Sequence, residues 1–235
     1  MTVEILFSEV CGLYGDKQNA DYLKKCLPEA EFIYTDLLSE PYFINNTPDI
    51  IYIGTMSENI QRRVIGKLSP FTDRINELID GGTVILATGN APEIFCEKIE
   101  YITEKTEING LCVFPLTVKN DLFRRYNGKT LGVCDNIKVV GFRSQFSFIY
   151  GDNSSYPFLE MTRGIGINPE SRFEGMRKNN FFCTSILGPL LPLNPLFTEY
   201  LISLTGEKAE AAFRNAAMDA YNQRIKEFED PKVKF

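Results

Sequence analysis

Short runs of apolar and β-branched residues recur in the first third of the chain. They lie at Val3–Phe7, Phe32–Tyr34, Ile50–Ile53 and Val84–Leu86. Each run is too short for a surface helix, and its continuous apolar character is typical of a strand buried on both faces of a sheet. The pattern therefore predicts four buried strands.

Amphipathic stretches separate these runs and predict helices. They cover Asp16–Leu27, Glu58–Leu68 and Thr72–Asp80, and the last is followed by Gly81 and Gly82, a common helix stop. Crossover helices are the simplest connection between parallel strands. We therefore predict an α/β fold whose doubly wound, mostly parallel sheet is flanked by helices.

The pattern changes after about residue 110, where several short strand-like segments follow one another. They cover Lys129–Cys134, Ile137–Val140 and Gln145–Ile149, and Tyr126-Asn127-Gly128 reads as a turn before the first of them. Strands that follow one another without helices pair most simply side by side. We expect antiparallel or mixed strands added to the core.

The last third predicts one more strand, at Asn180–Thr184, and two helices, at Pro195–Leu204 and Glu207–Phe228. The final helix has an apolar face suited to core or subunit packing, made of Phe213, Ala216, Ala217, Ala220, Tyr221, Ile225 and Phe228. No linker, repeat or low-complexity tract interrupts the chain. We therefore expect a single domain over residues 1–235.

Composition is that of an ordinary globular protein, with 44% hydrophobic and 24% charged residues among 235. The net charge is −6, and no basic cluster with interleaved aromatic residues stands out, so nucleic acid and anionic lipid are not expected partners. The most apolar late segment, Phe181–Phe197, is interrupted by Pro189, Pro192 and Pro195. We expect no membrane insertion and a cytoplasmic location.

The chain contains no histidine. This excludes Ser-His and Cys-His catalysis and histidine-ligated metals within the isolated chain. The cysteines form no C-x-x-C pair, so neither a structural zinc site nor a disulfide framework is expected; they are Cys11, Cys26, Cys96, Cys112, Cys134 and Cys183. We predict no metal and no cofactor.

Several glycine-containing motifs follow the predicted strands. In Tyr14-Gly15-Asp16 the glycine permits a tight turn and Asp16 is expected to cap the next helix. The others are Ile53-Gly54-Thr55, Leu86-Ala87-Thr88-Gly89-Asn90-Ala91-Pro92, Asn109-Gly110-Leu111, Gly141-Phe142 and Gly188-Pro189-Leu190-Leu191-Pro192-Leu193-Asn194-Pro195. In this order the motifs resemble class I (triad) glutamine amidotransferases of the cobyric acid synthase type. They are most similar to the glutamine amidotransferase subunits of lipid II isoglutaminyl synthase.

The resemblance implies a flavodoxin-like fold and two catalytic positions. In that family a cysteine nucleophile stands in a sharp turn after the fourth strand, and a histidine precedes the G-P-L-L-P run. Here Thr88 and Leu187 stand at these positions. A threonine hydroxyl needs a base to attack an amide, and leucine is not a base. The resemblance assigns Gly54, Gly89 and Arg125 to a remnant of the substrate-binding pocket.

The resemblance therefore predicts a catalytically inactive homologue that acts as a structural or regulatory subunit. Its expected partner is a Mur-ligase-like or other ATP-dependent amidating synthetase, met at the pocket rim or at the apolar face of the final helix. One alternative is an active amidohydrolase or transferase that uses another nucleophile, such as Cys11 or Cys96. Another is a sensor that binds glutamine or another small amide in the pocket.

Overall fold

A mostly parallel sheet forms the centre of the part of the chain that the computed structural model describes, residues 1–208 and 210–234. Its strand order is β13-β14-β4-β3-β1-β2, and only β13 runs antiparallel to its neighbour. The strands are β1 (Thr2–Leu6), β2 (Glu31–Thr35), β3 (Ile50–Ile53), β4 (Val84–Thr88), β13 (Met176–Lys178) and β14 (Phe181–Thr184). The predicted α/β, doubly wound sheet is confirmed.

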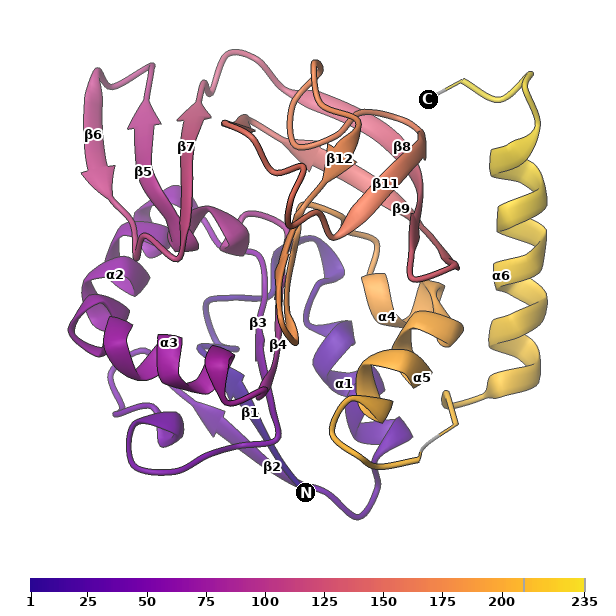
Figure 1. The fold of residues 1–235 in the computed structure, drawn as a ribbon, viewed down its shortest axis with the longest axis horizontal. Helices are drawn as coiled ribbons and strands as arrows, with labels where there is room; N and C mark the ends of the chain where they lie inside the picture. The colour runs from indigo at the N-terminus through magenta and orange to yellow at the C-terminus, as the bar shows by residue number, and fades with distance from the viewer. Residues whose placement is uncertain (209, 235) are drawn as a thin grey trace.

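Helices cover both faces of this sheet (Figure 1). On one face lie α2 (Glu58–Leu68) and α3 (Thr72–Asp80), joined by the 3-10 turn η3 (Ser69–Phe71). On the other lie α1 (Gln18–Cys26), α4 (Leu190–Leu193) and α5 (Pro195–Ser203). Each face has its own hydrophobic cluster, because alternate residues of each strand point to opposite sides.

Two further four-stranded sheets carry the added strands of the second half. One has the order β10-β7-β5-β6 and the other the order β12-β11-β8-β9, and antiparallel pairing dominates both. Their strands are β5 (Cys96–Tyr101), β6 (Thr106–Asn109), β7 (Phe114–Asn120), β8 (Tyr126–Cys134), β9 (Ile137–Gln145), β10 (Ser147–Tyr150), β11 (Leu159–Arg163) and β12 (Phe173–Glu174). Further 3-10 turns are η1 (Leu13–Gly15), η2 (Tyr42–Ile44) and η4 (Ala91–Phe95).

The turn predicted at Tyr126-Asn127-Gly128 is wrong, because these residues begin strand β8 and pair with the end of β9. The chain reverses instead at Asp135 and Asn136, whose φ angles are 46° and 68°. A two-residue hairpin that fits the twist of its strands needs positive φ at both positions, and aspartate and asparagine tolerate it. The predicted strand Gln145–Ile149 is divided between β9 and β10.

The final helix is shorter than predicted. It is α6 (Arg214–Glu229), seven residues later in its start than the predicted helix 207–228. Tyr221 and Phe228 of α6 are buried against Leu131 and Val140 of β8 and β9. Other members of the predicted apolar face are exposed, namely Phe213, Ala216 and Ala220. Met218 and Ile225 of α6 are half-buried against the same cluster.

Ala209, inside the predicted helix 207–228, and Phe235, the last residue of the predicted domain, lie outside the described residues. In the G-P-L-L-P run, Leu190 and Leu191 are fully buried and pack internally, while Gly188, Pro189 and Pro192 are half-buried. None of the helices among the described residues combines the length and apolarity that a membrane crossing requires.

Candidate functional site

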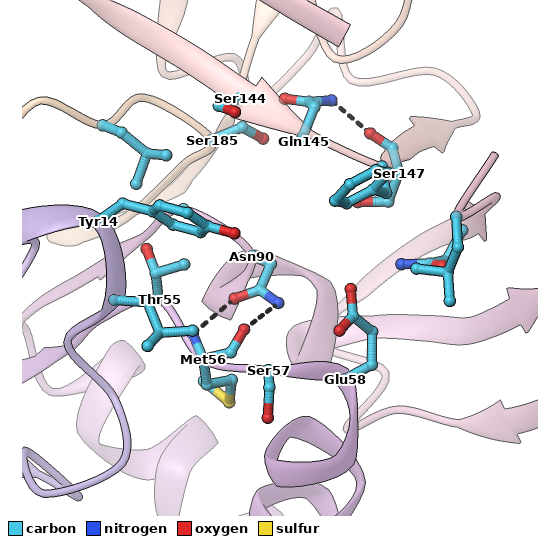
Figure 2. Close-up of a pocket in the computed structure, with 16 residues that line it drawn as sticks. Tyr14, Thr55, Met56, Ser57, Glu58, Asn90, Ser144, Gln145, Ser147 and Ser185 are labelled. Carbon is cyan, nitrogen blue, oxygen red and sulfur yellow. Dashed lines mark hydrogen bonds between the residues drawn. The ribbon is translucent and has the colours of Figure 1, made fainter. Parts of the chain in front are cut away.

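A cavity of about 150 Å³ lies at the carboxyl ends of four parallel strands (Figure 2). Ligand sites of open α/β sheets are commonly found at this edge. The segments after β1, β3, β4 and β14 contribute residues, and β7, β9 and β10 close the opposite side. The lining includes Leu13, Tyr14, Thr55, Met56, Ser57, Glu58, Gly89, Asn90, Asn120, Leu122, Ser144, Gln145, Phe146, Ser147, Ser185 and Leu187.

Beneath the floor of this cavity, Asp16 joins the ends of three strands. Its Oδ2 accepts hydrogen bonds from the backbone N (2.8 Å) and Oγ1 (2.7 Å) of Thr55 and from Thr88 Oγ1 (2.6 Å). Its Oδ1 accepts from Asn19 Nδ2 at 2.7 Å. Burial raises the pKa of Asp16, and the hydrogen bonds from Thr88 and Thr55 oppose that shift. Asp16 does not cap α1, so that expectation is wrong: its carboxylate accepts from the side chains of Asn19, Thr55 and Thr88 and from Thr55 N, and from no backbone N–H of α1.

Thr88, the position matched to the nucleophile, is fully buried and does not line the cavity. Its hydroxyl donates to Asp16 and lies 3.0 Å from the hydroxyl of Tyr52, below the floor. The sharp turn after β4 comes one residue later, at Gly89, whose φ is 66°. Thr88 is therefore placed to hold strands together and not to meet a ligand.

Gly89 lines the cavity, but Thr55 occupies the space beside it. A Cβ atom built on Gly89 would stand 1.9 Å from Thr55 Oγ1, far inside van der Waals contact. Thr55 Oγ1 is held there by its hydrogen bond to Asp16. The turn therefore has no side chain, and no room for one while Thr55 keeps this position.

Leu187, at the position matched to the base, lines the cavity. Its backbone exchanges two hydrogen bonds with Phe142, at 2.7 and 3.1 Å, which fixes it beside β9. Its side chain offers no atom that accepts a proton. The wall of the cavity is apolar at the point where the resemblance implies a histidine.

The other two predicted pocket residues lie outside the lining. Gly54 follows β3, and a Cβ there would approach Cys11 O to 2.9 Å and Asp16 Oδ2 to 3.1 Å, so glycine permits close backbone packing. Arg125 is exposed and donates from Nη2 to Ser144 Oγ at 2.7 Å. Since Ser144 lines the cavity, the structure brings Arg125 to its outer edge and leaves Gly54 below its floor.

Several cavity residues were missed from the sequence. Glu58 begins α2 and its carboxylate faces the cavity, while Asn90 fixes the facing loop by accepting from Met56 N (2.9 Å) and donating to Met56 O (2.8 Å) (Figure 2). Asn120, at the end of β7, is 3% exposed and lines the cavity. Glu58 and Asn90 could have been found from the sequence, since both lie in the segments that follow the apolar strands β3 and β4. Asn120 could not, because β7 reaches the cavity only through its pairing with other strands.

Behind the cavity wall, a buried carboxylate links the two halves of the molecule. Glu93 accepts hydrogen bonds from Ser147 Oγ of β10 and from Gln61 Nε2 of α2, the latter at 2.8 Å. Burial raises the pKa of Glu93 to about 7, and the nearby carboxylate of Glu58 adds to the rise. Tyr101 donates to Gln61 and completes a buried chain of polar groups.

The two cysteines considered as alternative nucleophiles lie away from the cavity. Cys11 is 2% exposed, and burial, with the carboxylates of Glu9 and Asp16, raises its pKa to about 12. Cys96 is fully buried, and burial raises its pKa well above the ordinary value. Because the thiolate is the reactive form, neither is activated. The described residues contain no group of three or more His, Cys, Asp or Glu side chains arranged to hold a metal ion.

Comparisons with known proteins agree with this architecture. No family model matches the chain. It is 28% identical over 173 residues to the GatD subunit of the glutamine-hydrolysing lipid II isoglutaminyl synthase of Staphylococcus aureus, covering 73% of this chain and 69% of that protein.

Two solved structures share the fold. A chain of PurLQS from Thermotoga maritima matches with a TM-score of 0.54 and 10% identity, over 95% of this chain and 98% of that one. A glutamine amidotransferase matches with a TM-score of 0.54 and 16% identity, over 87% and 99%. The chain is therefore similar in sequence to GatD and shares its fold with glutamine amidotransferases, as the motifs predicted.

Proposed function

We propose that this protein is a catalytically inactive glutamine amidotransferase homologue, of the cobyric acid synthase and lipid II isoglutaminyl synthase type, that serves as a structural or regulatory subunit of an amidating ligase complex. The observation that carries the proposal is the turn after β4. There Gly89 has no side chain and Thr55 fills the space that one would need. Because Thr88 is buried and Leu187 is apolar, neither matched position offers the cavity the nucleophile or the base that amide hydrolysis requires.

The subunit role is supported by the relatives and by the surface. GatD is by its name a subunit of a synthase. Large apolar side chains gather beside the mouth of the cavity on this chain, with Leu13 42%, Tyr14 59%, Leu122 41% and Phe123 86% exposed. Exposed apolar patches of this kind mark contacts with other proteins. We therefore place the synthetase, Mur-ligase-like or another ATP-dependent amidating enzyme, over this mouth.

Activity is tested by measuring ammonia release from excess glutamine, for the chain alone and with its synthetase. For the chain alone, we expect ammonia release at the level of a heat-denatured control. With the synthetase present, we expect the chain to add no ammonia release to that of the synthetase alone. Release above that level, retained through purification, would contradict the proposal of inactivity.

Complex formation is tested by co-expressing the chain with the synthetase-like protein encoded nearest to it and measuring the mass of the eluted complex by light scattering. Phe123→Ser is expected to weaken the complex at least tenfold. Leu38→Ser is the matched control, since Leu38 is 87% exposed in the loop after the edge strand β2 and does not line the cavity. Equal loss in both variants, or a free 26.7 kDa monomer of the wild type, would contradict the proposed contact.

One observation favours a second function, an amidohydrolase with a different nucleophile. Ser147 lines the cavity, and its hydroxyl donates to Glu93, a carboxylate whose pKa of about 7 suits a general base near neutral pH. The same ammonia assay separates this function from the first. Ammonia release that is lost in Ser147→Ala but kept in Ser144→Ala would assign the hydrolysis to Ser147.

A further inference from the structure

Among the described residues, the cavity lining contains an acidic side chain and no basic one. Of the side chains that line the cavity, Glu58 is the one acidic group, and the described lining contains no lysine or arginine. Two arginines lie next to lining residues: Arg125 binds Ser144 at the outer edge, and the buried Arg143 donates from Nε to Gln145 and from Nη1 to Ile165 O and Gly166 O. The Nη2 atom of Arg143 has no partner within the described residues, but Arg143 does not line the cavity. A ligand carboxylate would therefore enter without a partner, at a cost that burial increases.

Many hydrogen-bonding groups of the lining already have partners within the protein. The amide of Asn90 is used by Met56, that of Gln145 is used by Arg143 Nε and by the carbonyl of Ser147, and the hydroxyl of Ser147 is used by Glu93. These groups shape the cavity, and they are not free to recognise a ligand without breaking a bond.

Four polar side chains of the lining have no partner within the described residues, among them the hydroxyl of Ser185. Neither the carboxylate of Glu58 nor the amide of Asn120 forms a hydrogen bond or ion pair within the described part of the chain, although Asn120 is 97% buried. A buried amide normally has a partner. The hydroxyl of Tyr14 is likewise unpaired, and Figure 2 shows Tyr14 and Glu58 reaching toward the cavity from two sides.

We infer that this cavity binds a small organic amine, with the ammonium group on Glu58 and the rest of the ligand held by Asn120 and Tyr14. A carboxylate paired with N⁺–H forms one of the stronger hydrogen bonds in proteins. The aromatic ring of Tyr14 in the lining attracts a cation further, whereas the ring of Phe146 already has the guanidinium of Arg125 at 5.7 Å from its centroid. A cavity of about 150 Å³ accepts a molecule of about the size of benzene, which selects a primary amine of a few carbons that carries an amide or hydroxyl and no carboxylate.

This inference shares one premise with the proposed function, namely that the cavity does not hydrolyse glutamine. Isothermal titration calorimetry with three probes tests it: 4-aminobutanamide has the amine and the amide, glutaramate has the carboxylate and the amide, and L-glutamine has all three. We expect saturable binding of 4-aminobutanamide and affinities at least tenfold weaker for glutaramate and L-glutamine.

Glu58→Gln is expected to weaken 4-aminobutanamide binding at least tenfold, and Asn120→Ala to weaken it severalfold. Glu97→Gln is the matched control, since it removes one exposed negative charge of β5 outside the cavity and leaves binding unchanged. Absence of amine binding to the wild type, equal affinity in Glu58→Gln, or tighter binding of glutaramate or L-glutamine would overturn the inference. If no amine binds and ammonia release stays at background, the inference fails and the proposed function stands. If ammonia release exceeds background, the proposed function fails, whether or not an amine binds.

Discussion

The two sides of the cavity differ in how their polar groups are used. On the side of β4, Asp16, Thr55 and Thr88 satisfy one another in a closed buried network, and Thr55 fills the turn at Gly89. On the side of α2 and β7, Glu58 and Asn120 have no partner within the described residues. The side that would perform catalysis is closed, while the side that would hold a ligand is open. The proposed loss of catalysis and the proposed binding of a ligand thus rest on different sides of one cavity.

Removing the centre of the closed side should have the largest effect. Asp16→Ala leaves Thr55 N, Thr55 Oγ1 and Thr88 Oγ1 without the carboxylate that accepts from them, while Asn19 Nδ2 keeps its hydrogen bond to Tyr52 Oη. We expect the free energy of unfolding to fall by about 3–5 kcal/mol, since each orphaned donor costs about 1–3 kcal/mol and neighbours relax in part. Urea unfolding measures the change. Asp219→Ala, on the exposed face of α6, is the control and should change stability by less than about 0.5 kcal/mol.

Adding a side chain to the turn should have the next largest effect. Gly89→Ala is expected to lower the free energy of unfolding by about 2–4 kcal/mol, because a positive φ disfavours a Cβ and that atom would overlap Thr55 Oγ1. In a Thr55→Ala background the same change should cost at least about 1 kcal/mol less, because the overlapping oxygen is gone. Equal costs in the two backgrounds would show that Thr55 does not close the turn.

Titration of the carboxylate behind the cavity should have a somewhat smaller effect. The folded-state pKa of Glu93, about 7, lies above its ordinary value of 4.5, so the folded state binds the proton more tightly. Its contribution to stability is therefore full below about pH 4.5 and is lost as the pH rises through 7. From about pH 4.5 to about pH 7, the free energy of unfolding of the wild type should fall by roughly 2–3 kcal/mol more than that of Glu93→Gln. The free energy of unfolding is measured by urea unfolding at a series of pH values. Curves of this free energy against pH that run parallel for the wild type and Glu93→Gln would contradict the expectation. The control Glu97→Gln should follow the wild type.

The smallest expected effect is on activity. The double change Thr88→Cys with Leu187→His replaces both residues matched to the catalytic pair, yet position 88 faces Asp16 below the floor and cannot present a thiol to the cavity. Ammonia release from glutamine should stay at background. Activity within tenfold of an active homologue would show that the closed side opens on substitution.

The sequence predicts helices well where residues next to the helix ends determine where the helix begins and stops. Helices α2 and α3 have the predicted bounds, since Ser57 Oγ accepts from Ile60 N at the start of α2 and Gly81 follows the end of α3. Strand β7 was missed although its positions alternate between buried and exposed. Its Pro115 argues against a strand by local rules, and its place in the sheet comes from pairing with β5 and β10.

The site was harder to predict because its contacts join distant parts of the chain. Asp16 and Thr88 are 72 residues apart, and Glu93 and Ser147 are 54 apart, with no periodic pattern to relate them. Matching motifs placed the catalytic position at Thr88, but which side chain faces the cavity depends on a backbone angle at Gly89 that the sequence does not display.

Helix α6 packs on β8 and β9 through a small cluster that is separate from both large ones (Figure 1). Regions of low contact density open without unfolding the rest of a protein, so their amide hydrogens exchange with solvent independently. Amides of α6 should therefore exchange much faster than those of β1, β3 and β4, with a slope against denaturant that reports only local opening. The C-terminal helix would then be a separate cooperative unit, able to detach and rebind while the parallel sheet stays folded.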